Sequence, residues 1–197
     1  GALEHLKIIG PDPSKLVERL YPELSKLSEN TYSEFENVVF SLGTHNEHEI
    51  IDVIVRSDNS DFYERIEKCN HRISNIEDWD FARIAVGYPG SNEVNTKYLP
   101  HDIGMLNLIS LNKGCYPGQE IHARLDSRSK PKKRMVVLST NDVMEIGKYS
   151  LSDGSSIKIT SIAVKDGLHL SMGICSVDVS TDATLVNYNV ESKLTLL

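Results

Sequence analysis

The order of strand-like and helix-like segments in the first 76 residues limits the possible folds of this chain more than any other feature. Strand-like runs lie at 6–9, 35–42 and 49–55, and runs with helical spacing lie at 12–27 and 57–69. Asp12 is a favourable N-cap, and Pro13 suits the first position of a helix. With a last short strand in 71–77 the order becomes βαββαβ. This order predicts a ferredoxin-like α+β unit, in which two helices cover one face of an antiparallel sheet.

The last third of the chain, from Met135, consists of short strand-like runs separated by turn residues. Asp166–Gly167 between two of these runs is a strong signal for a two-residue hairpin. Five short strands in about 60 residues are typical of a small antiparallel β-barrel or sandwich, and we expect a barrel. The five runs are RMVVLST, SSIKITSIAV, LHLSMGICSV, ATLVN and KLTLL.

The middle of the chain, residues 77–134, is less regular. The run EDWDFARIAVG predicts a helix that ends at Gly87, with Asp78 as its cap and Pro89 as a stop. After a loop, MLNLISL (105–111) predicts a short strand. We therefore expect three parts: the ferredoxin-like unit in 1–76, a mixed segment in 77–134 and the barrel in 135–197.

Composition excludes several classes of protein. The net charge of −7 argues against a nonspecific nucleic-acid coat, so any site for a polyanion must be local. No apolar run approaches the roughly 20 residues of a membrane helix, and no secretory signal is visible at the start of the chain. The three cysteines are far apart, and no CxxC, HxxxH or HExxH motif is present. We expect no disulfide framework, no self-contained zinc site and a reducing compartment: the cytoplasm, or the mitochondrial matrix in a eukaryote.

The stretch LNKGCYPGQEIHAR (111–124) places a lone cysteine, Cys115, between a strand-like run and a helix-forming run. Pro117 suits a first helical turn, so the thiol would lie near the positive end of the helix dipole, with Lys113 nearby. Both features favour a reactive thiolate. The alternative is a small buried apolar side chain, which is the usual fate of a free cysteine. Spacing does not decide between the two.

The neighbours of Cys115 have similar pairs of interpretations. Gly114 and Gly118 could let the backbone approach a ligand, or they could be ordinary turn glycines. His122 could serve the thiol as a base. Cys69 and Cys175 fit the apolar core better than a reactive site.

A run of basic residues follows this stretch, opposed only by Asp126. In an acidic chain it is a local positive field, which could hold phosphates, carboxylates or RNA, or could be a solvated connector. Aromatic residues are not interleaved with it, which argues against direct binding of nucleic acid. The run consists of Arg124, Arg128, Lys130, Lys132, Lys133 and Arg134.

KGCYPGQE (113–120) resembles the K-G-C-Y-x-G-Q-E signature of the YgfZ family, folate-binding proteins similar to the aminomethyltransferase, or T-protein, of the glycine cleavage system. RIAVGYP (83–89) resembles the family's R-I-x-x-G-x-P step, and HARLDSRSKPKKRM resembles its A-R-x-x-x-R-G-x-x-K-R tail. Two positions differ: Asp102 stands where a glutamate is usual, and Ser129 stands where a glycine is usual. Because the stretch before the signature is shorter than in relatives, we expect a shortened member of the family, a piece of a longer chain, or a protein that completes its pocket with a partner.

The resemblance implies a fold of three parts, a tetrahydrofolate site and a role in assembly or repair of iron–sulfur enzymes, including some that modify tRNA. It implies that Cys115 is the functional residue. The residues implied around Cys115 and the folate are Lys113, Gly114, Tyr116, Gly118, Gln119, Glu120, Arg124 and Arg128.

The sequence is compatible with three functions. The first is a folate-binding accessory protein for iron–sulfur client enzymes, acting through Cys115 at a helix start. The second is an enzyme, a tetrahydrofolate-dependent aminomethyltransferase like the T-protein. The third is an RNA- or protein-binding module that uses residues 124–134.

Overall fold

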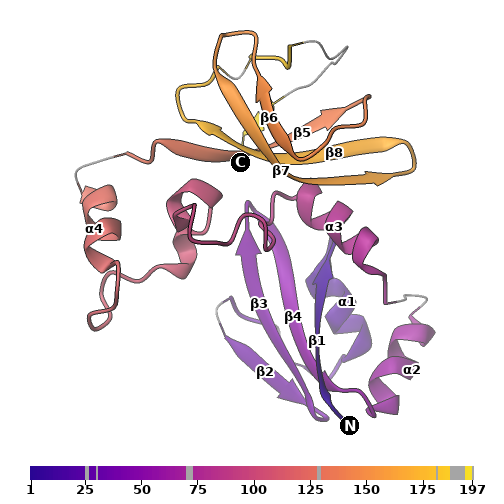
Figure 1. Cartoon of the computed structure of the whole chain (residues 1–197). Coiled ribbons are helices and arrows are strands. Elements are labelled where there is room, and N and C mark those ends of the chain that lie inside the picture. Colours follow the sequence, from indigo (N-terminus) through magenta and orange to yellow (C-terminus); the bar gives the residue numbers. More distant parts are fainter. Residues whose placement is uncertain are drawn as a thin grey trace. The chain divides into compact units, whose positions relative to one another are not determined.

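The computed structural model describes residues 1–24, 27–29, 31–69, 73–127, 130–180, 182–186 and 194–196. The chain divides into two compact units, Gly1–Ala82 and Arg83–Leu197 (Figure 1). The finer division of the second unit at residues 134 and 135 stays a prediction.

The first unit is a four-stranded antiparallel sheet with two helices. Its strands have the order β1-β4-β3-β2. Alternate residues of β3 and β4 share one apolar cluster with Val17 and Leu20 of α1 and Phe62 of α2, so both helices cover the same face. The elements are β1 (Leu3–Ile9), α1 (Pro13–Leu20), β2 (Tyr32–Phe35), β3 (Val38–His45), β4 (His48–Arg56) and α2 (Ser60–Lys68).

The predicted βαββαβ order is wrong in two places. The run 35–42 is not one strand, because Glu36 and Asn37 both have positive φ and form a two-residue turn that pairs Phe35 with Val38. This is the backbone of a type I′ hairpin, which Asn tolerates well. The predicted last strand in 71–77 is also absent where the structure describes it: 73–75 are irregular and a helix begins at Ile76, while residues 71 and 72 lie outside the described part.

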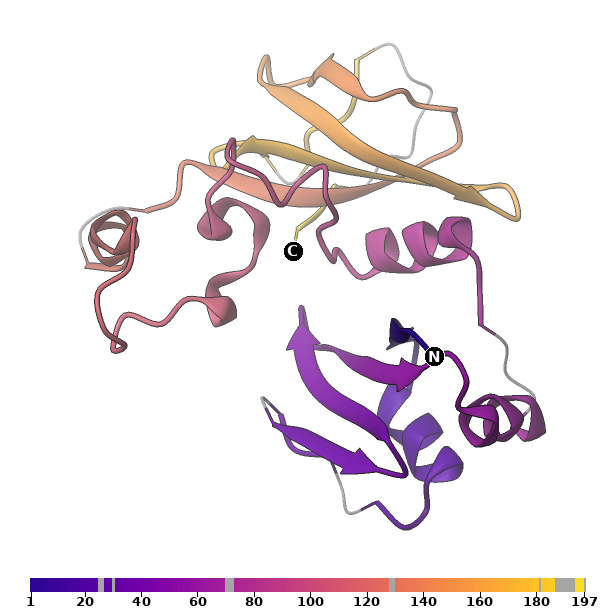
Figure 2. The ribbon, with the colours of Figure 1, turned by 60° about the horizontal axis from the view of Figure 1, so that its bottom comes forward.

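The second unit is built on a five-stranded antiparallel sheet of order β6-β7-β8-β5-β9 (Figure 2). Asp166 and Gly167 form the predicted hairpin turn between β7 and β8, both with positive φ. One face carries an apolar cluster around Val136, Ile157 and Ile159, and the other packs against Ile84 and Ile103. Its strands are β5 (Lys133–Thr140), β6 (Gly147–Ser150), β7 (Ser156–Lys165), β8 (Leu168–Ser176) and β9 (Leu194–Leu196).

The predicted closed barrel is not found among the described residues. The sheet is open, with β6 and β9 at its two edges. The run 183–187 supplies only a single bridge, between Leu151 and Leu185, where the structure describes it. An apolar run in sequence does not specify which strand it pairs with, so closure could not be read from the pattern.

The segment between β4 and β5 is mostly helical or irregular. The predicted helix after residue 76 is confirmed as α3, but the Asn75 side chain accepts the Asp78 N–H at 2.9 Å, so Asn75 rather than Asp78 is the cap. The predicted strand 105–111 is wrong, because its first half is a 3-10 helix. The elements are α3 (Ile76–Ala85), the 3-10 helices η1 (Pro100–Ile103) and η2 (Leu106–Leu108), and α4 (Gln119–Ser127).

Candidate functional site

The cysteine loop, residues 111–119, lies between η2 and α4. Tyr116, Pro117, Gly118 and Gln119 form a β-turn, closed by the Gln119 N–H donating to the Tyr116 carbonyl at 3.2 Å. Pro117 fits the second position, and Gly118, with φ of 88°, supplies the left-handed third position of a type II turn. The Gln119 side chain donates to the Leu111 carbonyl at 3.1 Å. This bond ties the two ends of the loop together, with Cys115 midway between them.

Three ring side chains form a row that begins in the loop with Tyr116. The rings of Tyr116 and His122 stack at 6.3 Å between centroids, and the rings of His122 and His101 stack at 5.3 Å with an interplanar angle of 11°. The Lys113 ammonium lies 4.7 Å from the centre of the Tyr116 ring, in cation–π distance. His101 comes from η1 and His122 from α4, so the row joins two separate elements of the chain.

Two polar atoms of this row are buried without a hydrogen bond. The Tyr116 hydroxyl and His122 Nδ1 have no partner among the residues that the structure describes. A buried polar atom without a partner costs about 1–3 kcal/mol. Such atoms are therefore candidates for contact with a ligand or an ordered water.

The thiol of Cys115 is exposed, so the interpretation as a buried apolar filler is wrong. The predicted position at a helix start is also wrong, since α4 begins at Gln119, four positions after the cysteine. The physical reason is the Pro117–Gly118 turn, because the left-handed Gly118 cannot belong to a right-handed helix. The field of a helix terminus decays within about one turn, so the helix dipole gives the thiol little help. His122 makes no hydrogen bond to Cys115 within the described part of the chain.

The other predicted site residues differ in their surroundings. Gly114 has no positive φ, and a Cβ there would meet nothing within 4 Å, so the backbone has open space at this point. Glu120 and Arg124 are exposed on α4. Arg128 lies outside the described residues.

Asp102 also lies near this row of rings, next to His101 in η1. It is buried, and its carboxylate accepts the Leu99 N–H at 3.0 Å at the start of η1. The carboxylate therefore holds the backbone from which His101 projects.

The basic run of residues 124–134 is divided by the fold. Lys132 and Lys133 line a groove on the sheet, whereas the Arg134 guanidinium donates to the Val179 carbonyl at 2.6 Å. Arg134 also lies against Cys175, which is buried in strand β8. Burial raises the pKa of the Cys175 thiol, and Arg134 only partly opposes this. Cys175 is thus the quiet core thiol that the sequence predicted.

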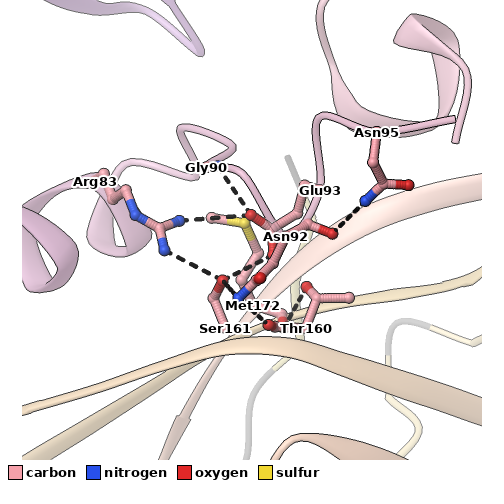
Figure 3. A network of polar contacts seen from close by, with 8 residues as sticks. All are labelled: Arg83, Gly90, Asn92, Glu93, Asn95, Thr160, Ser161 and Met172. Carbon is pink, nitrogen blue, oxygen red and sulfur yellow. Dashed lines mark hydrogen bonds and ion pairs between the residues drawn. The ribbon is translucent and has the colours of Figure 1, made fainter. Parts of the chain in front are cut away.

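The structure contains a buried polar network that the sequence analysis did not predict (Figure 3). Arg83, at 6% exposure, lies 3.5 Å from the carboxylate of Glu93, which has no exposed surface. The Ser161 hydroxyl donates to the other Glu93 oxygen at 2.8 Å and accepts from Arg83 at 3.1 Å. Glu93 also accepts the Gly90 N–H at 2.8 Å. The network attaches loop 86–99 to strand β7, and only the arginine of the RIAVGYP motif indicated it.

Among the described residues no group of three or more His, Cys, Asp or Glu side chains could hold a metal ion. No helix in the described part of the chain is long and apolar enough to cross a membrane.

Comparison with known proteins places the chain beside two curated sequences. The tRNA-modifying protein YgfZ of Yersinia enterocolitica is 28% identical over 145 residues, which are 66% of this chain and 44% of that protein. A chloroplastic protein of Arabidopsis thaliana, whose name describes it as a transferase, is 38% identical over 85 residues, 42% of this chain and 20% of that protein. The matches thus span less than half of each relative. No family model matches the chain.

Among solved structures, the glycine cleavage system aminomethyltransferase T of Bartonella henselae superimposes with a TM-score of 0.66. The match covers 98% of this chain and 57% of that enzyme at 12% identity, so it shows a shared fold and nothing more.

Proposed function

The chain is a YgfZ-like protein with the fold of the glycine cleavage aminomethyltransferase, and we propose that it is a folate-binding accessory protein for iron–sulfur enzymes that acts through Cys115. The observation that carries the proposal is an exposed thiol on a tied loop, next to buried polar atoms that lack partners. Because the relatives are longer than the matched part, their activities come to this chain only as proposals.

The residues beside the loop fit a tetrahydrofolate site in chemical type. A folate has a flat heteroaromatic ring system with donors and acceptors, and it carries carboxylates. The Tyr116 hydroxyl and His122 Nδ1 are buried atoms that require a hydrogen-bond partner, and the Tyr116–His122–His101 row offers ring surface. Lys113 and Arg124 supply positive charge for carboxylates. Bound tetrahydrofolate would supply one-carbon chemistry.

The role of Cys115 follows from its exposure. An exposed thiol can lose its proton to solvent and offer a thiolate sulfur to iron in a client protein, because thiolates are the preferred ligands of iron–sulfur clusters. The Gln119–Leu111 bond ties together the two ends of the loop that carries the sulfur.

Complementation tests this role. We expect that a bacterial strain lacking its own YgfZ protein is rescued by the chain, that Cys115→Ala abolishes rescue and that Cys69→Ala does not. Equal rescue by Cys115→Ala, with equal protein levels, would overturn the role of the thiol.

Calorimetric titration with tetrahydrofolate tests the ligand. We expect saturable binding that weakens when Tyr116→Phe removes the buried hydroxyl, while Tyr32→Phe, at an exposed strand residue of the first unit, leaves it unchanged. Absence of binding to the wild-type chain would remove folate from the proposal but leave the thiol role to the complementation result.

The aminomethyltransferase alternative rests on a likeness of fold at 12% identity. It requires transfer of a one-carbon unit to tetrahydrofolate, and turnover in that assay that persists in Cys115→Ala would favour the enzyme over the accessory protein. Client enzymes, including enzymes that modify tRNA, and a reducing compartment stay predictions.

A further inference from the structure

A groove on the second unit gathers positive charge away from the cysteine loop. Its volume is about 480 Å³, and its walls include four lysines, three serines and Tyr98. The lysines come from separate places in the sequence: Lys132 precedes β5, Lys133 starts it, Lys148 lies on β6 and Lys158 lies on β7. We call these residues the lysine groove.

The lysines are arranged at a cost to the fold. Lys148 and Lys158 lie directly opposite each other in the β6–β7 pairing, and like charges in such a pair destabilise a sheet. No ion pair joins any of the four to a carboxylate among the described residues, although acidic residues outnumber basic ones by 28 to 21 in the chain. A charge cluster that the chain leaves without counter-ions is typical of a site for an external anion.

Two aspartates adjoin the groove, and both contact serines. Asp153 accepts from the Ser155 hydroxyl and backbone, and Asp178 lies 3.5 Å from the Ser176 hydroxyl. The four lysines still outnumber these two carboxylates. The groove therefore keeps an excess of positive charge.

The side chains favour phosphate over carboxylate. Arginine is the usual residue for planar two-pronged recognition of a carboxylate, and no arginine lines the groove within the described part of the chain. Lysine acts as a point charge that suits the rounded charge of a phosphate group. Serine hydroxyls are common additional contacts to phosphate oxygens, but those of Ser155 and Ser176 already contact Asp153 and Asp178, so Ser156 is the serine that we expect in this role.

The size and the single aromatic residue favour a small ligand over a nucleic-acid strand. The volume falls within the range of about 300–1,000 Å³ that is usual for small-molecule sites. Proteins that track single strands use exposed aromatic faces for base stacking, but the Tyr98 ring is half-buried against the core and carries the Lys133 ammonium 5.5 Å from its centre. We propose that the lysine groove binds a small anion that carries two or more linked phosphate groups, at a site separate from the cysteine loop.

Titration of the whole chain with inorganic tripolyphosphate tests this inference. We expect saturable binding that weakens with added salt, and a loss of about tenfold or more in affinity in Lys148→Gln/Lys158→Gln. The matched control Lys68→Gln/Lys165→Gln removes the same charge outside the groove, and we expect it to change the affinity by less than about twofold. All these lysines are exposed, so an unchanged circular dichroism spectrum is expected. Because Lys148→Gln/Lys158→Gln also removes the repulsion between the two opposed lysines, its thermal unfolding midpoint should be equal to or slightly above that of the wild-type chain.

Two comparison ligands decide the class. Citrate binding as tightly as tripolyphosphate would overturn the preference for phosphate, and tighter binding of a short single-stranded RNA, lost in the same double variant, would overturn the small-ligand assignment. No binding of tripolyphosphate, or equal loss in both double variants, would remove the site. Weak binding of citrate and of RNA would support it.

Discussion

Removal of the Glu93 carboxylate by Glu93→Ala should destabilise the second unit more than any exposed substitution. Glu93 has no exposed surface and contacts three partners: Arg83 at 3.5 Å, the Ser161 hydroxyl at 2.8 Å and the Gly90 N–H at 2.8 Å. Without the carboxylate, the guanidinium of Arg83 remains buried at 6% exposure and loses its ion pair with Glu93. Breaking one side of a buried ion pair in this way costs about 3–5 kcal/mol.

The assay is thermal and urea unfolding followed by circular dichroism. A loss of about 3–5 kcal/mol should lower the midpoint of thermal unfolding of this unit by roughly 10 °C or more. Hydrogen exchange of the amides in β7 and β8 assigns the loss to this sheet, because the two units need not unfold together. The control is Glu64→Ala, which breaks the exposed Glu64–Lys68 pair at 3.3 Å and should change stability by less than about 0.5 kcal/mol.

A double-mutant cycle separates the ion pair from packing. Replacing both partners, as in Arg83→Met/Glu93→Leu, removes both charges of this pair. The double variant should recover about 1–3 kcal/mol relative to the sum of the losses in Arg83→Met and Glu93→Leu. A loss below about 1 kcal/mol in Glu93→Ala, or strictly additive losses in the cycle, would refute the reasoning.

Three further predictions concern other parts of the chain. Gly118→Ala should lower the free energy of unfolding in urea by about 1–2 kcal/mol, since Gly118 has φ of 88°. Gly114→Ala is the control and should cost almost nothing, because Gly114 has an ordinary φ and open space around it. Equal losses in the two variants would contradict the turn. Burial raises the pKa of Tyr21 to about 12, and a hydrogen bond to Glu4 raises the pKa of Tyr63 to about 12. Each hydroxyl therefore stays protonated to a higher pH in the folded state than in the unfolded state, where its pKa is 10. The resulting contribution to folding stability is fully present below pH 10 and is lost as the pH rises to about 12. Absorbance of tyrosinate should show two late-titrating tyrosines, one of which disappears in Tyr63→Phe. Cys115 should react with iodoacetamide much faster than Cys175, which is 4% exposed and has a raised thiol pKa; mass spectrometry that finds the opposite order would contradict the burial of Cys175.

Local rules predicted the elements whose signals are contained in a few neighbouring residues. Asp12 and Pro13 marked the start of α1, and Asp166–Gly167 marked the β7–β8 turn. The signature around Cys115 predicted a YgfZ-like protein, and the similarity to the Yersinia protein supports that likeness. Local rules failed where two conformations compete at similar energy. Glu36 and Asn37 form a turn inside an apolar run that was predicted as one strand, and residues 106–108 form a 3-10 helix where a strand was predicted.

The sequence by itself determined the helix and hairpin starts, the acidic balance and the family signature, because each depends on residues adjacent along the chain. Only the tertiary structure decided that the thiol of Cys115 is exposed, that Arg83 meets Ser161 across 78 positions and Glu93 meets it across 68, and that four lysines line one groove. These contacts join residues whose separation in sequence carries no periodic signal, and they form only when burial of the apolar faces brings the strands and loops together. The charges and hydroxyls that define both candidate sites were visible as residues, but their grouping is a property of the folded chain.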